Sequence, residues 1–333
     1  ELTLSGAVTT IAGEGGVAGD FINGTGTAAK FNQPYAITTD GSNLYIVDRG
    51  NHAIRQMVIA TSVVTTLAGT GSPGFVNGTG TAASFDDPRA ITTDGTNLYV
   101  ADSDNNAIRQ IVIATGVVTT LAGSGSSGSA DGTGAAATFN GPRGITTDGT
   151  NIYVSDTGNS LIRQIVISSA AVTTLTGDGT QGSNNGVGTA AQHNQPWGIT
   201  LDTAGENLYV CDYGGDTIRK IVISSKTVST IAGQYMTTGS TNGTGTAALF
   251  YEPSHLTTDG TNLYISDFGN HTIRKLVIAT NVVTLLAGQV GVGGYADNAN
   301  PLQATFLNTI GITTDGKDLY TAEWGSYTIR KID

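Results

Sequence analysis

The sequence predicts an all-β protein, a six-bladed β-propeller of four-stranded antiparallel blades. Three observations support this: a phrase repeated six times, four strand-like segments in each repeat, and chain ends that complement each other. The phrase P-x-x-I-T-T-D-G-x-N-L-Y recurs at intervals of 54, 54, 54, 57 and 56 residues. Its copies start at Pro34, Pro88, Pro142, Pro196, Pro253 and, with threonine in the proline position, Thr309. The 333 residues are therefore expected to form a single domain, 1–333.

Each repeat contains four short segments rich in β-branched and aromatic residues, which are typical of strands. In order they read I-T-T-D, N-L-Y-V-x-D, A-I-R-Q-I-V-I and V-V-T-T-L-A. An Asp-Gly pair, as at Asp40-Gly41, separates the first two segments and favours the positive φ that a tight hairpin needs. Four antiparallel strands in every repeat, with no long helix, indicate a propeller blade.

The two chain ends supply the parts of one blade. The last repeat stops after its third segment at Ile332-Asp333, while the chain opens with a fourth segment at residues 7–13. Pairing these segments closes the ring and removes two exposed sheet edges. The expected blades span 34–69, 88–123, 142–177, 196–233 and 253–288, with the sixth made from 309–333 and 7–13.

Composition excludes several classes of protein. Charged residues make up only 12% of the chain, and no apolar run approaches the roughly 18 residues of a membrane-spanning helix, so we expect no membrane insertion. The net charge of −11 disfavours a nucleic-acid partner, because phosphate binding needs a basic face. The single cysteine, Cys211, excludes an intrachain disulfide and is expected to be a buried structural thiol.

Several motifs resemble NHL-repeat β-propellers. They are D-x-x-N-H-x-I-R at 48–55 and 267–274, P-x-G-I at 142–145 and 196–199, and L-A-G-x-G followed by D-G-x-G. The resemblance covers nearly the whole chain and implies the six-bladed fold. It leaves function open, since the family includes peptide-amidating lyases, sensor domains of receptor kinases, RNA-binding propellers and many secreted bacterial proteins.

Residues present in every blade are expected to serve the blade itself, whereas a ligand site breaks the symmetry. An acidic residue ends each second strand, seven positions before an arginine, and we expect these pairs to be structural ion pairs. The recurring tyrosine of N-L-Y is expected to pack within the blade. The pairs are Asp48–Arg55, Asp102–Arg109, Asp156–Arg163, Asp212–Arg219, Asp267–Arg274 and Glu323–Arg330.

The residues that break the symmetry gather in two positions. One directly follows the repeat proline, where the inner strand starts beside the central channel. The other lies in the turn between strands two and three, on the same face. Together they predict a cationic arc over blades one to three and an aromatic arc over blades four to six, suited to an anionic ligand. The expected ligand-binding residues are Tyr35, Arg49, Arg89, Arg143, Trp197, Tyr213, His255, Phe268 and Trp324.

His255 is the one histidine on an inner strand, where other blades carry alanine or glycine, so its side chain must enter the channel mouth. His193 takes a position that is phenylalanine elsewhere and is expected in a small apolar slot. The resemblance implies that an amidating lyase would hold a metal with channel histidines. This chain offers His255 alone there, so we expect no cofactor, with a channel-mouth metal ion as the less favoured alternative.

We therefore expect a recognition module without catalysis of its own, which binds a protein, peptide or carbohydrate, such as an acidic glycan. Low lysine and high threonine, glycine and asparagine contents favour an extracellular, periplasmic or bacterial cell-surface location. One alternative is a metal-dependent lyase or lactonase-like hydrolase with His255, Tyr35 and the arginines at the mouth. Others are a purely structural unit, or arginines that simply pair with Asp86, Asp87 or Glu252.

Overall fold

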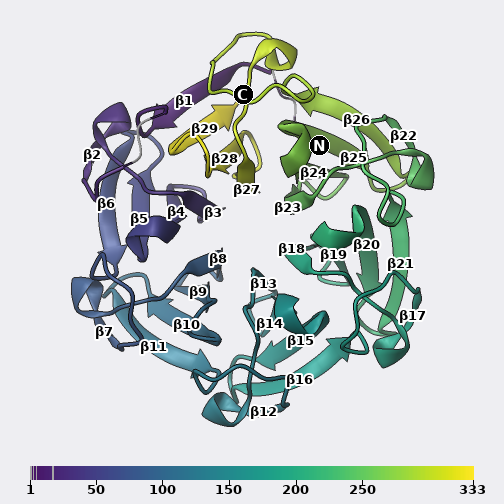
Figure 1. The fold of residues 1–333 in the computed structure, drawn as a ribbon. Coiled ribbons are helices and arrows are strands. Elements are labelled where there is room, and N and C mark those ends of the chain that lie inside the picture. Colours follow the sequence, from purple (N-terminus) through teal and green to yellow (C-terminus); the bar gives the residue numbers. More distant parts are fainter. Residues whose placement is uncertain (1, 3, 5, 17–18) are drawn as a thin grey trace.

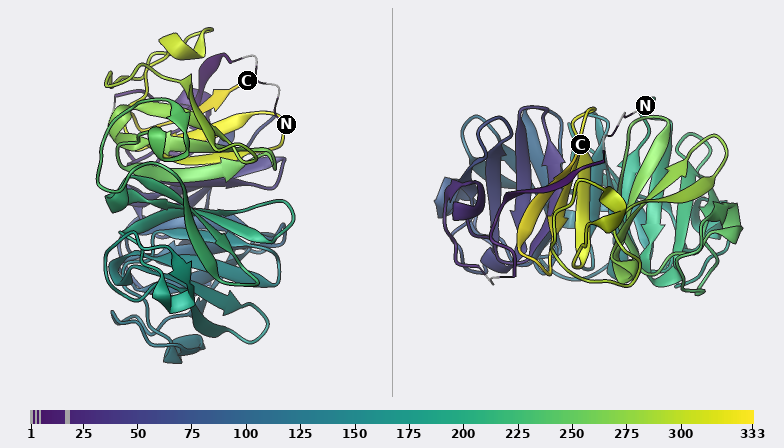
Figure 2. Two further views of the ribbon diagram at one scale, coloured as in Figure 1. Left: turned by 90° about the vertical axis from the view of Figure 1, so that its right-hand side faces the viewer. Right: turned by 90° about the horizontal axis from the view of Figure 1, so that it is seen from above.

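The structure, a computed structural model, is a six-bladed β-propeller, as the sequence predicts, and it describes residues 2, 4, 6–16 and 19–333. Six antiparallel sheets surround a central channel, and the chain visits them in order around the ring (Figure 1). Seen from the edge, the blades stand side by side with loops on both faces of a flat ring (Figure 2). No helix among the described residues has the length and apolar character to cross a membrane.

The inner strands line the channel, and each one pairs outward with the second strand of its blade. They are β3 (Pro34–Thr39), β8 (Pro88–Thr93), β13 (Gly144–Thr147), β18 (Pro196–Leu201), β23 (Pro253–Thr258) and β27 (Thr309–Thr314). The second strands are β4 (Asn43–Asp48), β9 (Asn97–Asp102), β14 (Asn151–Asp156), β19 (Asn207–Asp212), β24 (Asn262–Asp267) and β28 (Leu319–Glu323).

The third and fourth strands complete each blade toward the outside. The third strands are β5 (Ala53–Val58), β10 (Ala107–Val112), β15 (Leu161–Val166), β20 (Thr217–Val222), β25 (Thr272–Val277) and β29 (Thr328–Ile332). The fourth strands are β6 (Val63–Ala68), β11 (Val117–Ala122), β16 (Ala171–Thr176), β21 (Thr227–Ala232), β26 (Val282–Ala287) and β1 (Val8–Ala12).

Five blades carry a fifth strand of two residues on the outer edge, which the sequence did not predict. It forms because an Asn-Gly or Asp-Gly pair, followed by threonine or valine, precedes each short 3₁₀ turn and runs antiparallel to the fourth strand. These strands are β2 (Gly24–Thr25), β7 (Gly78–Thr79), β12 (Gly132–Thr133), β17 (Gly186–Val187) and β22 (Gly243–Thr244), followed by η1 (Gly26–Ala28), η3 (Gly80–Ala82), η4 (Gly134–Ala136), η6 (Gly188–Ala190) and η8 (Gly245–Ala247). In the sixth blade the corresponding turn is η10 (Pro301–Gln303).

The ring closes where the first strand pairs with the last. β1 runs antiparallel to β29, with Val8 opposite Ile332 and Thr10 opposite Arg330. This pairing places the first and the last of the long strands in one blade (Figure 1). It confirms that the N-terminal strand completes the C-terminal blade.

Buried ion pairs hold the turns of every blade. Each third-strand arginine donates to the carboxylate that ends the second strand, at 2.7–3.2 Å, and both side chains are excluded from solvent. The same guanidinium also donates to backbone carbonyls of the loop from the preceding blade, as Arg109 does to Ser84 and Val76. Because one arginine bonds two segments, the expected structural role of the repeated pairs agrees with their geometry.

Candidate functional site

In two opposite blades the residues that follow the repeat proline meet across the central channel. The residue before the proline is in the left-handed region in all six blades, with φ between 49° and 55°. In blades one and four the resulting strand start brings Tyr35 and Trp197 together from opposite sides of the ring. Their ring centroids are 6.3 Å apart.

These side chains close one end of the channel. Tyr35, Trp197 and Ile310 are 2%, 7% and 2% exposed and belong to one hydrophobic cluster. We call these three residues the plug, and the face that carries them the plug face. The sequence indicates which side chains lie at the channel mouth. It does not show that the rings of Tyr35 and Trp197 reach the channel axis and close the mouth.

An aromatic row continues from the plug over blades four and five. Tyr213, in the turn η7 (Tyr213–Gly215), stacks on Trp197 with centroids 3.7 Å apart and an interplanar angle of 8°. Phe268, in η9 (Phe268–Asn270), follows at 6.3 Å from Tyr213. Trp324, from the equivalent turn of blade six, packs against the same cluster. The structure thus brings the four aromatic residues of the predicted arc into one layer with Tyr35.

The three arginines outside the repeat lie on the same rings. The guanidinium carbons of Arg49 and Arg89 lie 5.6 and 5.5 Å from the centroid of Tyr35, and that of Arg143 lies 4.8 Å from Trp197. The cations and the rings are therefore interleaved, whereas the sequence suggested two facing arcs. Guanidinium groups favour this arrangement because they are attracted to the negative face of an aromatic ring.

Asp87 separates the arginines into two kinds. Its carboxylate pairs with Arg49 through one oxygen and with Arg89 through the other, which lies 2.5 Å from Nη2 of Arg89. Arg143 forms no salt bridge with a carboxylate among the described residues; its backbone N–H donates to Ser155, and its guanidinium lies over the indole of Trp197. Asp87 therefore pairs directly with Arg49 and Arg89, whereas it acts on Arg143 only from a distance.

The surroundings of Arg143 favour an anion. Burial lowers the pKa of its guanidinium, and the positive charges of Arg89 and Arg49 lower it further, whereas Tyr35 and Asp87 act in the opposite direction without cancelling the shift. An arginine nonetheless stays protonated at neutral pH, so the positive charge is retained in a partly desolvated position. A ligand carboxylate would relieve both unfavourable effects through a bidentate, charge-assisted contact.

The plug face also holds buried polar atoms that have no hydrogen-bond partner. They include the indole N–H groups of Trp197 and Trp324. Leaving such a group unpaired costs about 1–3 kcal/mol. Tyr213 differs, because burial and a hydrogen bond to Glu252 raise the pKa of its hydroxyl. A polar ligand on the plug face could pair with the orphaned groups.

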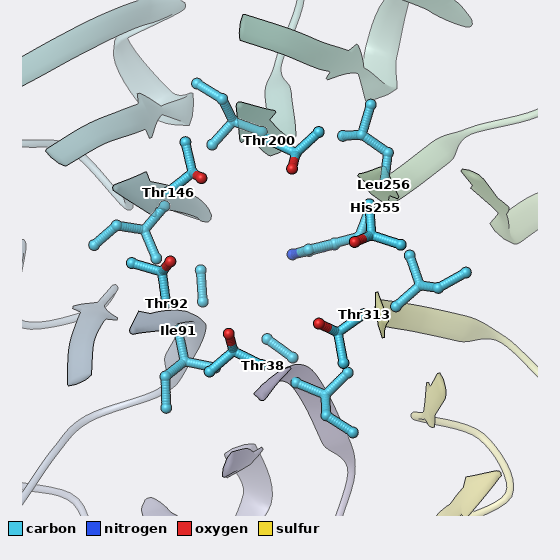
Figure 3. Close-up of a pocket in the computed structure, with 15 residues that line it drawn as sticks. Thr38, Ile91, Thr92, Thr146, Thr200, His255, Leu256 and Thr313 are labelled. Atoms are coloured by element: carbon cyan, nitrogen blue, oxygen red, sulfur yellow. The ribbon is translucent and has the colours of Figure 1, made fainter. Parts of the chain in front are cut away.

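His255 lies below the plug and points into the channel (Figure 3). Its ring packs edge-on toward Tyr35 with centroids 6.0 Å apart, and neither nitrogen has a hydrogen-bond partner. Burial lowers the pKa of the imidazole to about 4, so the ring is neutral at pH 7. Around it the channel is lined by one threonine from each inner strand: Thr38, Thr92, Thr146, Thr200, Thr257 and Thr313.

The other histidines connect elements of the scaffold. Nδ1 of His52 accepts a hydrogen bond from the backbone N–H of Asp87 in the next blade, and Nδ1 of His271 accepts one from Asn308. His193 is fully buried, but the expectation of a small apolar slot is wrong. Its Nε2 lies 3.0 Å from the hydroxyl of Thr176 and its Nδ1 lies 3.3 Å from a carboxylate oxygen of Asp212.

The described residues contain no group of three or more histidine, cysteine, aspartate or glutamate side chains placed to hold a metal ion. Cys211 is buried, and desolvation raises the pKa of its thiol, as expected for a structural cysteine.

Sequence comparison confirms the resemblance to NHL-repeat proteins. The chain is 26% identical over 301 residues to NHL repeat-containing protein 2 of Gallus gallus, covering 79% of this chain. It is 27% identical over 321 residues to the chloroplastic protein SUPPRESSOR OF QUENCHING 1 of Arabidopsis thaliana, covering 91% of this chain. The chain spans only 41% and 30% of the length of these two relatives. No family model matches the chain.

Solved structures share the fold at low sequence identity. An auxiliary nutrient binding protein from Bacteroides thetaiotaomicron superposes with a TM-score of 0.75 at 17% identity, covering 98% of this chain and 76% of that one. A streptogramin B lyase superposes with a TM-score of 0.56 at 11% identity, covering 98% and 97% of the two chains. The protein is therefore a six-bladed propeller with NHL-repeat relatives, and its plug face carries the candidate site.

Proposed function

We propose that this propeller is a non-catalytic binding module that holds a carboxylate-bearing or otherwise anionic ligand on its plug face. The observation that carries the proposal is the guanidinium of Arg143, which lies over Trp197 without a carboxylate partner among the described residues. Arg49 and Arg89 share the single negative charge of Asp87 and frame the site. The ligand anion would pair with Arg143 while its apolar part covers the Trp197–Tyr213 stack.

Two further considerations support binding over chemistry. Structural neighbours of the same fold are described as auxiliary nutrient binding proteins, from B. thetaiotaomicron and Bacteroides ovatus. The plug face also lacks a nucleophile with an adjacent base among the described residues. Extracellular or cell-surface placement stays a prediction from composition. A metal-dependent lyase or hydrolase remains the competing function, and metal analysis of the purified protein would test it.

The test is a calorimetric binding screen with matched acidic and neutral ligands, namely uronic-acid and neutral oligosaccharides, and acidic peptides with their amidated counterparts. We expect acidic members to bind and Arg143→Gln to weaken them by about tenfold or more, which is ~1.4 kcal/mol or more. Lys317→Gln is the control, because it removes one positive charge from the hairpin turn on the opposite face, where Lys317 is exposed. Equal binding by the unmodified protein and Arg143→Gln would overturn the proposal.

A further inference from the structure

The loops after the fourth strands of blades four and five expose apolar side chains beside the aromatic row, and so does the nearby Tyr251. Their exposed fractions range from 36% for Tyr235 to 65% for Met236. We call these residues the apolar crescent: Tyr235, Met236, Tyr251, Val290 and Val292.

Hydrogen bonds fix the apolar crescent to the same turns that carry Tyr213 and Phe268. The N–H of Met236 donates to the carbonyl of Gly215 at 3.0 Å, and Gly291, between the two valines, donates to Asn270 at 3.0 Å. The carbonyl of Tyr251 accepts from Gly269 at 2.8 Å, and the Tyr251 ring lies so close that a Cβ on Gly269 would be 2.5 Å from it. The apolar crescent therefore borders the plug face on the side of blades four and five.

The first three blades show that the fold does not need apolar residues in these places. The first residues of their loops after the fourth strand are hydroxyl, carboxylate or glycine residues, and the position of Tyr251 is polar in blades one to four. These loop residues are Thr70, Ser72, Ser124, Ser126, Asp178 and Thr180, and the counterparts of Tyr251 are Asn32, Asp86, Asn140 and Asn194. Phe75 and Val76 are also exposed, but they lie later in their loop, next to the outer strand β7. An exposed apolar patch that lies beside an aromatic row is expected at an interaction site.

We propose that the ligand of the plug face is a polypeptide segment, whose apolar side chains pack on the apolar crescent and whose carboxylate pairs with Arg143. This inference rests on the proposed function and narrows its ligand class. Charge complementarity selects the carboxylate, because Arg143 is the one plug-face guanidinium without an acidic partner among the described residues. The aliphatic side chains of Met236, Val290 and Val292 favour a polypeptide over a sugar. Proteins bind sugars by stacking them on flat aromatic rings and by hydrogen bonds, and aliphatic side chains provide neither.

The Trp197–Tyr213 stack connects the two halves of this surface. Arg143 lies over Trp197, and the stacked Tyr213 belongs to the turn that holds the loop of Met236. An extended segment lying along this path would meet a cation first, then aromatic rings, then aliphatic side chains. We therefore expect an acidic residue or a free C-terminus a few positions from two or three large apolar residues.

The experiment is selection of a phage-displayed random dodecapeptide library on the immobilised whole chain. Synthetic peptides of the consensus are then titrated against variants. The test variant is Met236→Ser/Val290→Ser. Its control is Val63→Ser/Val117→Ser, which removes two exposed valines, each 37% exposed, from outer strands away from the plug face. Unfolding midpoints establish that all variants are folded.

The inference is supported if the selected peptides combine apolar residues with a carboxylate and bind the test variant about tenfold more weakly than the unmodified protein. Their affinity for the control variant should lie within twofold of that for the unmodified protein. Peptides without this composition, or equal affinity for the test variant, overturn it. Failure of the proposed function is distinguishable. If acidic oligosaccharides bind through Arg143 and no peptide does, only the inference fails. If Arg143→Gln changes the binding of no ligand, both fail.

Discussion

The indole of Trp197 and the phenol of Tyr213 stack with their centroids 3.7 Å apart and their planes inclined by 8°, although they belong to different parts of blade four. Trp197 opens the inner strand, and Tyr213 lies in the turn after the second strand. The stack fixes the indole under the guanidinium of Arg143, and so joins the sealed channel end to the outer surface of the plug face.

This stack gives a spectroscopic prediction. The chain has two tryptophans, so Trp324→Phe leaves Trp197 as the only indole. Binding of an acidic ligand to Trp324→Phe should change the intensity or the emission maximum of the fluorescence, because the ligand alters the environment of the Arg143–Trp197 pair. In Trp197→Phe the fluorescence change should disappear. A ligand-induced change that persists in Trp197→Phe and is lost in Trp324→Phe would place the ligand beside Trp324 of blade six and not at the Arg143–Trp197 pair.

Asp87 should restrain anion binding, because its carboxylate pairs with two of the three arginines on this face and offsets one of their positive charges. We expect Asp87→Asn to raise affinity for acidic ligands several-fold at low salt, with the gain shrinking as ionic strength increases. The same change should lower the free energy of unfolding by roughly 1 kcal/mol, since it replaces charge-assisted hydrogen bonds to two partly buried arginines with at most one neutral hydrogen bond. Titrations at two salt concentrations measure the first effect. Asp86→Asn, in the neighbouring residue, is the control, and an equal affinity gain there would contradict the assignment.

His255 should make the fold sensitive to acid. Its pKa is lowered to about 4 in the folded state, against 6.5 for an ordinary histidine, because burial disfavours the charged ring. The unfolded chain therefore binds more protons between these values. The contribution of neutral His255 to the free energy of unfolding is therefore complete above pH 6.5, decreases below it, and is lost as the pH falls through 4. The shift corresponds to roughly 3 kcal/mol.

His255→Ala, which installs the residue of blades one and two, should thus narrow the difference in unfolding free energy between pH 7.5 and pH 4. Denaturant unfolding at both pH values measures the effect. His52→Asn is the matched control, because blade two carries Asn106 in that turn and makes the same kind of inter-blade hydrogen bond. If the two variants depend on pH alike, the imidazole of His255 is not held in its neutral form by burial.

The buried ion pairs should be costly to break from one side. Arg109 donates to Asp102 at 2.7 Å with both side chains fully buried. Arg109→Leu should therefore destabilise the protein by about 3–5 kcal/mol, because it leaves a buried carboxylate without its cation. Arg109→Leu/Asp102→Leu should recover part of that loss. Thermal unfolding of both variants decides, and a double variant less stable than the single one would argue against unpaired charge as the cause.

The ring and its closure could be predicted from the sequence, because each blade repeats the same strand and turn residues. The six repeats can therefore be aligned with one another. The sequence also identified the positions after each proline and in the second turn as neighbours, since both depend only on blade topology. The fifth strand was missed because two-residue pairing by Gly24 and Thr25 has no periodic signal.

The contacts within the plug face could not be derived from the sequence. Whether Tyr35 and Trp197 meet depends on the width of the channel relative to the side chains, which no pattern in the chain encodes. The division of the arginines by Asp87 likewise follows from a left-handed residue that turns its carboxylate toward two blades. The apolar crescent was overlooked, although Tyr235 and Met236 stand where blades one to three have polar residues, a signal open to direct comparison of the repeats.

The most direct test of the central claim is a crystal structure of the chain with an acidic ligand taken from the binding screen. The account predicts density for the ligand on the plug face, with its carboxylate within hydrogen-bond distance of both terminal nitrogens of Arg143 and its apolar part against Trp197 and Tyr213. A ligand bound on the opposite face, in the threonine-lined channel or along the outer strands, with Arg143 free, would contradict it.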